Sequence, residues 1–331
     1  MELVCPAGNL PALKAAVNAG ADAVYIGFQN ATNARHFAGL NFTNKQIETG
    51  VAYAHQRGCK VFIAVNTYPY SKQMPQWHTA VDAAVDLGVD ALILADMGVM
   101  AYAHKKHPKL NLHLSVQGSA TTHQAVNFYA QSFGIKRAVI PRVLSVKQVA
   151  HLIKNSEVPI EVFGFGSLCV MVEGRCFLSS YATGLGPNNF GACSPASHVK
   201  WEQKDGHLAT RLNDVLIDQV PDGESVGYPT ICKGRYCVNK QTGYAIEEPT
   251  SLNTLAILPD LKRLGVAAIK VEGRQRSPAY VKQVATIMRA AIDQCERTGD
   301  DYQVKPQWQA DLAELSEGQQ TTLGAYYRKW Q

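Results

Sequence analysis

Three stretches of the chain repeat one pattern: AGADAVYIG (residues 19–27), LGVDALILAD (residues 87–96) and LGVAAIKVEG (residues 264–273). In each, a glycine of the kind that ends helices is followed by a short polar or apolar segment and then by an apolar run. Nearly continuous apolar strands are typical of a parallel sheet that helices cover on both faces. The repeated unit is therefore a helix followed by a buried strand, which indicates an α/β protein.

Five further apolar runs of the same kind lie along the chain, and each crossover is long enough for a helix. Eight strand–helix units in order favour a TIM-like (β/α)8 barrel. A doubly wound open sheet is the rival fold, but no G-x-G-x-x-G follows the first strand. The predicted strands are residues 2–8, 22–27, 60–67, 90–96, 110–117, 136–142, 160–166 and 267–274.

The connection between the seventh and eighth predicted strands is too long for an ordinary loop. It is rich in Gly, Pro and Asn and contains the strand-like pieces SHVKWEQ, HLATRLND, VLIDQV and GYAIEE. We therefore expect a long β-rich insertion beside the barrel mouth, and a tail whose aromatic residues dock on the barrel. The predicted parts are residues 1–166 (seven βα units), 167–265 (cysteine-containing insertion), 266–300 (eighth strand and helix) and 301–331 (packed C-terminal tail).

Composition is that of an ordinary globular enzyme, since 46% of the 331 residues are apolar and 18% are charged. The net charge of +5 (32 basic minus 27 acidic) comes without a long basic run, which gives little support for extended nucleic-acid binding. No apolar run could span a bilayer, and the N-terminus does not resemble a secretory signal, so we expect a cytoplasmic protein. In that reducing compartment eight cysteines are not expected to form structural disulfides.

Four of the cysteines lie in Gly- and Pro-rich sequence after the seventh predicted strand, where turns can aim sulfur atoms at a common point. Four thiolates bind zinc or hold an iron–sulfur cluster. The absence of a C-x-x-C pair favours a cluster over a zinc ribbon, and Cys237 remains an alternative to the last of the four. The candidate ligands are Cys169, Cys176, Cys193 and Cys232.

Polar residues gather at the predicted carboxyl ends of the strands, where barrel enzymes bind their substrates. For any single one of these residues, a structural role in helix capping or ion pairing is as good an explanation as a functional role. Together, the arginines favour a small anionic substrate, because guanidinium groups bind carboxylates in a fixed orientation. The candidates for substrate binding are Asn33, Arg35, Arg142, Glu272 and Arg274, and those for catalysis are Glu173, Arg175 and His36.

Several motifs carry a family resemblance that runs through essentially the whole chain. CPAGN (5–9), TNARHFAGLNFT (32–43), FGSLCVMVEGRC (165–176), CKGRY (232–236) and KVEGRQRSPAY (270–280) resemble the collagenase-like peptidase U family, family thirty-two. The resemblance implies a [4Fe-4S] cluster on Cys169, Cys176, Cys193 and Cys232. It also prefers Cys232 over Cys237, because Cys232 lies in the CKGRY motif.

The resemblance further implies a role in the O2-independent hydroxylation of an aromatic ring in ubiquinone biosynthesis. The implied partners are a UbiV-like paralogue in a heterodimer, a UbiT-like lipid-binding accessory protein and a polyprenylated quinone precursor. Prephenate is a candidate oxygen donor, and no stable nucleic-acid partner is expected. An RNA-base hydroxylase of the same family and a purely structural cluster remain alternatives. Proteolysis is disfavoured, because the sequence has neither H-E-x-x-H nor G-x-S-x-G.

Overall fold

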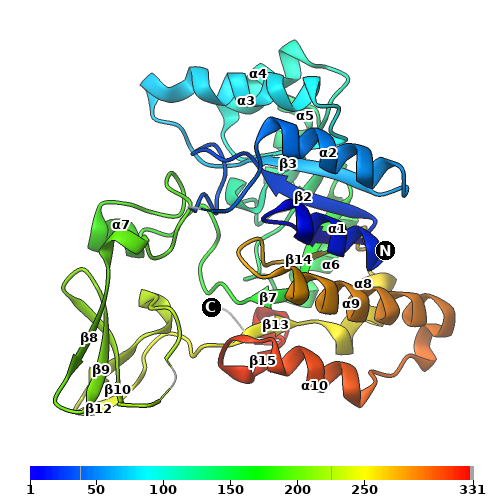
Figure 1. The fold of residues 1–331 in the computed structure, drawn as a ribbon. Coiled ribbons are helices and arrows are strands. Elements are labelled where there is room, and N and C mark those ends of the chain that lie inside the picture. Colours follow the sequence, from blue (N-terminus) through cyan, green and yellow to red (C-terminus); the bar gives the residue numbers. More distant parts are fainter. Residues whose placement is uncertain (38, 225, 329–331) are drawn as a thin grey trace.

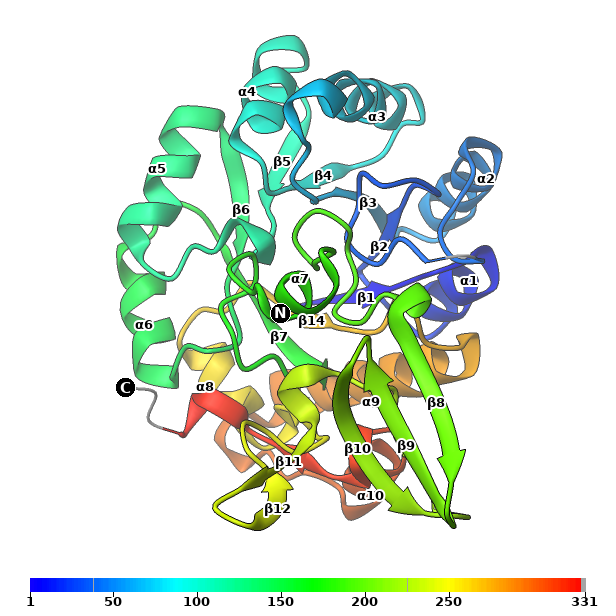
Figure 2. The same ribbon diagram turned by 90° about the vertical axis from the view of Figure 1, so that its left-hand side faces the viewer.

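Eight parallel strands close into a barrel, which confirms the predicted TIM-like fold (Figures 1 and 2). The structure is a computed structural model that describes residues 1–37, 39–224 and 226–328. The last barrel strand, β14, pairs in parallel with both β7 and β1 and so completes the ring. The strands are β1 (Glu2–Pro6), β2 (Ala23–Gly27), β3 (Lys60–Val65), β4 (Ala91–Leu94), β5 (Asn111–Leu114), β6 (Ile135–Val139), β7 (Ile160–Ser167) and β14 (Ala268–Val271).

Helices surround the barrel, as Figure 2 shows end-on. Local sequence determines several of their ends: Thr43 and Ser145 each form a capping box that satisfies backbone N–H groups at a helix start. Gly134 ends α5 in the left-handed conformation that a glycine adopts without strain. The helices are α1 (Leu10–Asn18), α2 (Asn44–His55), α3 (Met74–Asp86), α4 (Met97–Lys106), α5 (His123–Phe133), α6 (Val146–Asn155), α8 (Leu258–Arg263) and α9 (Pro278–Thr298).

The apolar core divides into two layers, because successive strand residues point to opposite faces. Residues such as Val24 and Ile26 belong to the large layer between strands and helices. Their neighbours Tyr25, Phe62 and Ile93 belong to a small separate cluster inside the barrel. The inner cluster consists mainly of small side chains, which leaves room for polar groups in the barrel interior.

A buried ion pair lies among these inner residues. Lys270 on β14 donates to Glu161 on β7 at 2.7 Å, and the side chains are 6% and 1% exposed. Arg137 contacts the same carboxylate at 3.4 Å and pairs with Glu2 at 2.6 Å. The attraction of Lys270 and Arg137 lowers the pKa of Glu161, although burial opposes it. The barrel interior therefore tolerates Lys270 only because Glu161 compensates its charge.

The long connection after β7 forms a β-rich insertion, as predicted. It contains α7 (Leu178–Thr183), an antiparallel sheet and a hairpin. In Figure 2, α7 lies in front of the barrel mouth. The GYAIEE piece is a strand only in part, because β12 ends at Tyr244. The strands are β8 (Val199–Lys204), β9 (His207–Leu212), β10 (Val215–Pro221), β11 (Arg235–Val238) and β12 (Gln241–Tyr244).

The chain then returns to the barrel before the eighth strand. β13 (Ser251–Asn253) pairs antiparallel with β7, and β15 (Thr321–Thr322) of the tail adds in parallel to β13. Helix α10 (Pro306–Glu314) precedes β15. The Tyr326 hydroxyl donates to the carbonyl of Phe163 on β7 at 3.1 Å, so the tail is anchored on the barrel. No helix among the described residues is long and apolar enough to cross a membrane.

We expect Glu161→Leu to reduce the free energy of unfolding by about 3–5 kcal/mol, because it leaves Lys270 buried without a compensating charge. Adding Lys270→Met to that variant should restore most of the loss. Equilibrium unfolding in urea measures both changes. The control Arg263→Ala alters an exposed ion pair and should change stability by about 1 kcal/mol or less. If the double variant were as unstable as Glu161→Leu alone, lost packing rather than charge would explain the effect.

Candidate active site

A cavity of about 1290 Å³ lies at the carboxyl ends of the barrel strands, where barrel enzymes place their active sites. Three parts of the chain line it. The strands contribute residues such as Tyr25 and Phe163, the insertion contributes Tyr228, and the tail contributes Glu317. The insertion and the tail together therefore cover the mouth of the barrel.

All four predicted cysteine ligands line this cavity, whereas the alternative Cys237 does not. Cys237 is exposed on β11. Burial raises the pKa of Cys169 to about 12 and that of Cys232 to about 11, and the nearby Cys193 contributes to both shifts. The structure thus brings Cys169 and Cys176 from one loop, and Cys193 and Cys232 from two others, to one cavity.

Backbone contacts hold these cysteine loops against the barrel. The N–H of Arg35 donates to the carbonyl of Gly191 at 3.0 Å, which ties the loop before Cys193 to the loop after β2. Gly191 has a φ of 84°, and a Cβ there would lie 2.9 Å from the Arg35 nitrogen, so this approach requires a glycine. The Asn188 amide donates to the carbonyl of Cys176 at 3.1 Å.

The donor set suits a soft metal or an iron–sulfur cluster, since all four groups are thiols. Within residues 1–37, 39–224 and 226–328, however, no three His, Cys, Asp or Glu side chains are grouped closely enough to hold a metal ion. The four cysteines nevertheless line one shared cavity.

Arg142 and Glu173 form a buried ion pair in the cavity wall. Arg142 Nε donates to Glu173 Oε1 at 2.7 Å, and both side chains are 6% exposed. Arg142 also donates to the carbonyl of Ser167, and its guanidinium lies 4.3 Å from the centre of the Phe163 ring. Burial lowers the pKa of Arg142, but the attraction of Glu173 outweighs it and the net shift is upward. Arg142 is thus a fixed cation.

Arg274 is a second cavity cation with a different environment. Its Nη1 donates to Asn33 Oδ1 at 2.9 Å, and no carboxylate in the described part of the chain forms an ion pair with it. Burial lowers its pKa to about 10. Gly27 leaves room for it, because a Cβ there would lie 2.5 Å from Nη1. A buried guanidinium without a carboxylate partner is suited to an anionic ligand.

Of the eight predicted substrate-binding or catalytic residues, five line the cavity: Arg35, Arg142, Glu173, Glu272 and Arg274. Arg35 pairs with Glu272 at 3.6 Å. Asn33 is fully buried behind Arg274 and positions it. His36 does not line the cavity, and burial lowers its pKa. Arg175 is exposed and donates to the carbonyl of Ser119 at 3.1 Å.

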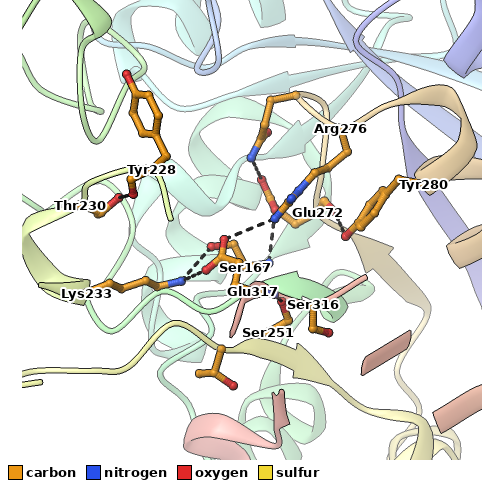
Figure 3. A network of polar contacts seen from close by, with 12 residues as sticks. Ser167, Tyr228, Thr230, Lys233, Ser251, Glu272, Arg276, Tyr280, Ser316 and Glu317 are labelled. Atoms are coloured by element: carbon orange, nitrogen blue, oxygen red, sulfur yellow. Dashed lines mark hydrogen bonds and ion pairs between the residues drawn. The ribbon is translucent and has the colours of Figure 1, made fainter. Parts of the chain in front are cut away.

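Sequence reasoning missed the tail's contribution. Lys233, next to Cys232, pairs with Glu317 of the tail and donates to the Ser167 hydroxyl at 3.3 Å (Figure 3). Arg276 contacts the other Glu317 oxygen at 3.6 Å. No local pattern in LSEGQQ marks Glu317, since its partners are 41 and 84 residues away. This network links insertion, barrel and tail at one edge of the cavity.

A second, smaller hollow of about 660 Å³ adjoins the cavity. Met171, Leu178 and Ile231 line both, so the two spaces share a wall. The outer hollow also contains Phe177 and Tyr181, which are 67% and 97% exposed. Arg175 lies on its rim. An apolar groove thus borders the loop that carries the first two cysteines.

Comparisons with known proteins give one consistent family. The chain matches the model of Peptidase family U32 over residues 8–329. The "Uncharacterized protease MJ0090" of Methanocaldococcus jannaschii is 33% identical over 298 residues, which cover 88% of this chain and 65% of that protein. The tRNA hydroxylation protein P of Escherichia coli is 29% identical over 312 residues, which cover 88% of this chain and 68% of that protein.

A third relative is the 23S rRNA 5-hydroxycytidine synthase of Escherichia coli, which is 29% identical over 301 residues. The match covers 91% of this chain and 40% of that enzyme. The chain spans about two thirds of the length of the first two relatives. Because the family model and these matches cover nearly the whole chain, the predicted family is confirmed: this chain belongs to peptidase family U32.

Proposed function

We propose that this chain is the iron–sulfur subunit of an O2-independent hydroxylase acting on the aromatic ring of a polyprenylated phenol in ubiquinone biosynthesis. In this proposal the chain is a UbiU-like protein, and a UbiV-like paralogue and a UbiT-like lipid-binding protein would be its partners. The observation that carries the proposal is the set of four thiols around a large cavity at the barrel mouth. Relatives named as tRNA and rRNA hydroxylation proteins support the reaction class.

The arrangement of the thiols supports a [4Fe-4S] cluster on Cys169, Cys176, Cys193 and Cys232. Four thiolates are a ligand set for such a cluster, and all four of these cysteines line the same cavity. When bound, the cluster would supply electron transfer at the cavity. Lys233 is placed beside Cys232 to offset part of the negative charge of four thiolates.

The apolar groove supports a lipid-tailed substrate. It shares the wall formed by Met171, Leu178 and Ile231 with the cavity, so a ring held in the cavity could extend a hydrocarbon chain along Phe177 and Tyr181. Burying an apolar chain against these exposed side chains is favourable in proportion to the area covered. A nucleotide within an RNA strand would instead present phosphates to this groove.

Arg274 supports an anionic co-substrate, for which prephenate is the candidate oxygen donor. Arg274 faces the cavity without a carboxylate partner among the described residues, while Arg35 and Arg142 are paired with Glu272 and Glu173. A carboxylate of prephenate would give Arg274 the charge-assisted hydrogen bonds that Asn33 alone cannot supply.

Two further readings are weaker. An RNA-base hydroxylase fits the names of the relatives, and binding of RNA with a steep dependence on salt would favour it. A serine peptidase would need a base beside Ser167. The Ser167 hydroxyl accepts a hydrogen bond from Lys233, and no histidine in the described segments forms one with it.

The cluster proposal predicts that the protein purified without oxygen contains iron and sulfide and shows the broad visible absorbance of a cluster. Cys169→Ala should lose both the metal and the absorbance. The matched control is Cys237→Ala, which removes an exposed thiol outside the cavity and should leave both intact. Metal and sulfide analysis and an absorbance spectrum measure the cluster content of each variant. Zinc without iron, or equal loss in the two variants, would contradict the proposal.

The anion proposal predicts that Arg274→Met weakens prephenate binding about 10- to 100-fold, because a charge-assisted hydrogen bond contributes roughly 1.5–3 kcal/mol. Arg175→Met is the control, since Arg175 lies outside the cavity and should bind prephenate as the wild type does. Titration calorimetry under anaerobic conditions measures both. Equal losses in the two variants, or none in Arg274→Met, would remove Arg274 from the site.

A further inference from the structure

Buried polar atoms without a hydrogen-bond partner concentrate around the cavity. Ten such side-chain atoms occur in the described part of the chain, and six of them belong to residues that line the cavity. Hydroxyl groups can rotate to donate or accept, so they indicate little about a ligand. The informative atoms are those that can only accept, namely Gln117 Oε1, Glu173 Oε2 and Asn188 Oδ1.

Neighbouring residues hold Glu173 in place, and one of its two carboxylate oxygens, Oε2, has no hydrogen-bond partner. Arg142 occupies Oε1 at 2.7 Å, and the Ser119 hydroxyl donates to the Glu173 carbonyl at 2.7 Å. The next residue, Gly174, has a φ of 88°, and a Cβ there would lie 2.0 Å from the Gln117 carbonyl oxygen. This close packing fixes the loop against the segment that follows β5. Glu173 is 6% exposed, so its free Oε2 has little access to bulk water.

Gln117 belongs to that neighbouring segment. Its carbonyl accepts from the Tyr68 hydroxyl at 2.6 Å and its N–H donates to the Ser115 hydroxyl at 3.2 Å, while its side chain is 8% exposed and lines the cavity. Each of the two packed segments therefore contributes to the cavity lining one residue whose side-chain oxygen has no hydrogen-bond donor. An unsatisfied buried acceptor is costly, so a ligand that donates a hydrogen bond here would bind favourably.

We infer that Glu173 Oε2 and Gln117 Oε1 together form the site that binds a hydroxyl group of the substrate. On the proposed function, on which this inference rests, that group is the phenolic O–H of the ring. Glu173 Oε2 can only accept, so it offers no hydrogen bond to a carboxylate, whereas the Arg274 guanidinium can donate to one. Glu173 and Gln117 would thus bind the phenol hydroxyl, and Arg274 would bind the anionic co-substrate. The two ligands would therefore be oriented by different residues of the cavity.

The position of Glu173 also bears on regiochemistry. It lies between Cys169 and Cys176 in the loop after β7, and all three residues line the cavity. A ring anchored by its hydroxyl at Oε2 would present a defined edge to the space that the thiols surround. Glu173 is therefore assigned as a substrate-binding residue that selects the ring position exposed to reaction.

The test compares an ortho-prenylphenol with its methyl ether, which has the same shape but cannot donate a hydrogen bond. Wild-type protein, purified without oxygen, should bind the phenol about 10-fold more tightly than the ether, and ligand-observed NMR can measure both. In Glu173→Gln the amide oxygen can still accept from Arg142, while the amide N–H₂ faces the cavity. This variant should lose the preference for the phenol or reverse it.

The matched control is Glu317→Gln, because both Glu317 oxygens already have cationic partners in the same cavity. It should keep the preference. Gln117→Met keeps the Arg142–Glu173 ion pair and should reduce the preference for the phenol. This second variant keeps the test decisive if Glu173→Gln does not fold. Thermal unfolding checks the fold of each variant.

Equal affinity of the wild type for phenol and ether would overturn the inference, as would an unchanged preference in Glu173→Gln or an equal loss in Glu317→Gln. Displacement of the phenol by cytidine or uridine at lower concentration would assign these acceptors to a nucleobase N–H instead and overturn the phenol assignment. Because the readout is binding, a preference that depends on Glu173 would stand even if no hydroxylation were observed. In that case only the proposed function would fail.

Discussion

The pairing of β14 with both β7 and β1 is the constraint on which the rest of the structure depends. It closes the barrel and removes its open edges. Closure also places Lys270 on β14, and Glu272 and Arg274 in the segment that follows it, at the cavity. Because β7 and β14 are parallel, the connection between them leaves the barrel at its mouth and re-enters at the opposite end. The part of the insertion that lies at the mouth covers the cavity.

The cavity that results has chemically distinct walls. The insertion after β7 contributes four cysteine thiols. Arg274 contributes a guanidinium that forms no ion pair with a carboxylate among the described residues, and Glu173 and Gln117 contribute acceptor oxygens without a hydrogen-bond donor. Each is held by neighbours that are distant in sequence, as Asn33 holds Arg274 across 241 residues. We propose that this preorganisation lets the site bind two different small molecules in fixed orientations. The apolar groove beside the cysteine loop would hold the hydrocarbon chain of the proposed substrate.

Much of this architecture could be predicted from sequence, because buried parallel strands appear as continuous apolar runs that local composition reveals. The cysteines stood out for a similar reason, since they occur in turn-rich sequence after a strand. Spacing alone did not separate Cys232 from Cys237, and only the family motif CKGRY preferred Cys232. The structure places Cys232 in the cavity wall and leaves Cys237 exposed on β11. Glu317 was missed, and the contact of Asn33 with Arg274 was not foreseen, because both depend on contacts between distant segments. The exposure of Arg175 likewise depends on the path of its loop.

We propose that the four cavity thiols hold an iron–sulfur cluster at the mouth of the barrel. Anomalous diffraction at the iron absorption edge, from crystals of protein purified and kept without oxygen, can test this. We expect one iron peak inside the cavity, bonded to the Sγ atoms of Cys169, Cys176, Cys193 and Cys232. An iron peak elsewhere, a ligand at Cys237 in place of Cys232, or a signal at the zinc edge alone would contradict it.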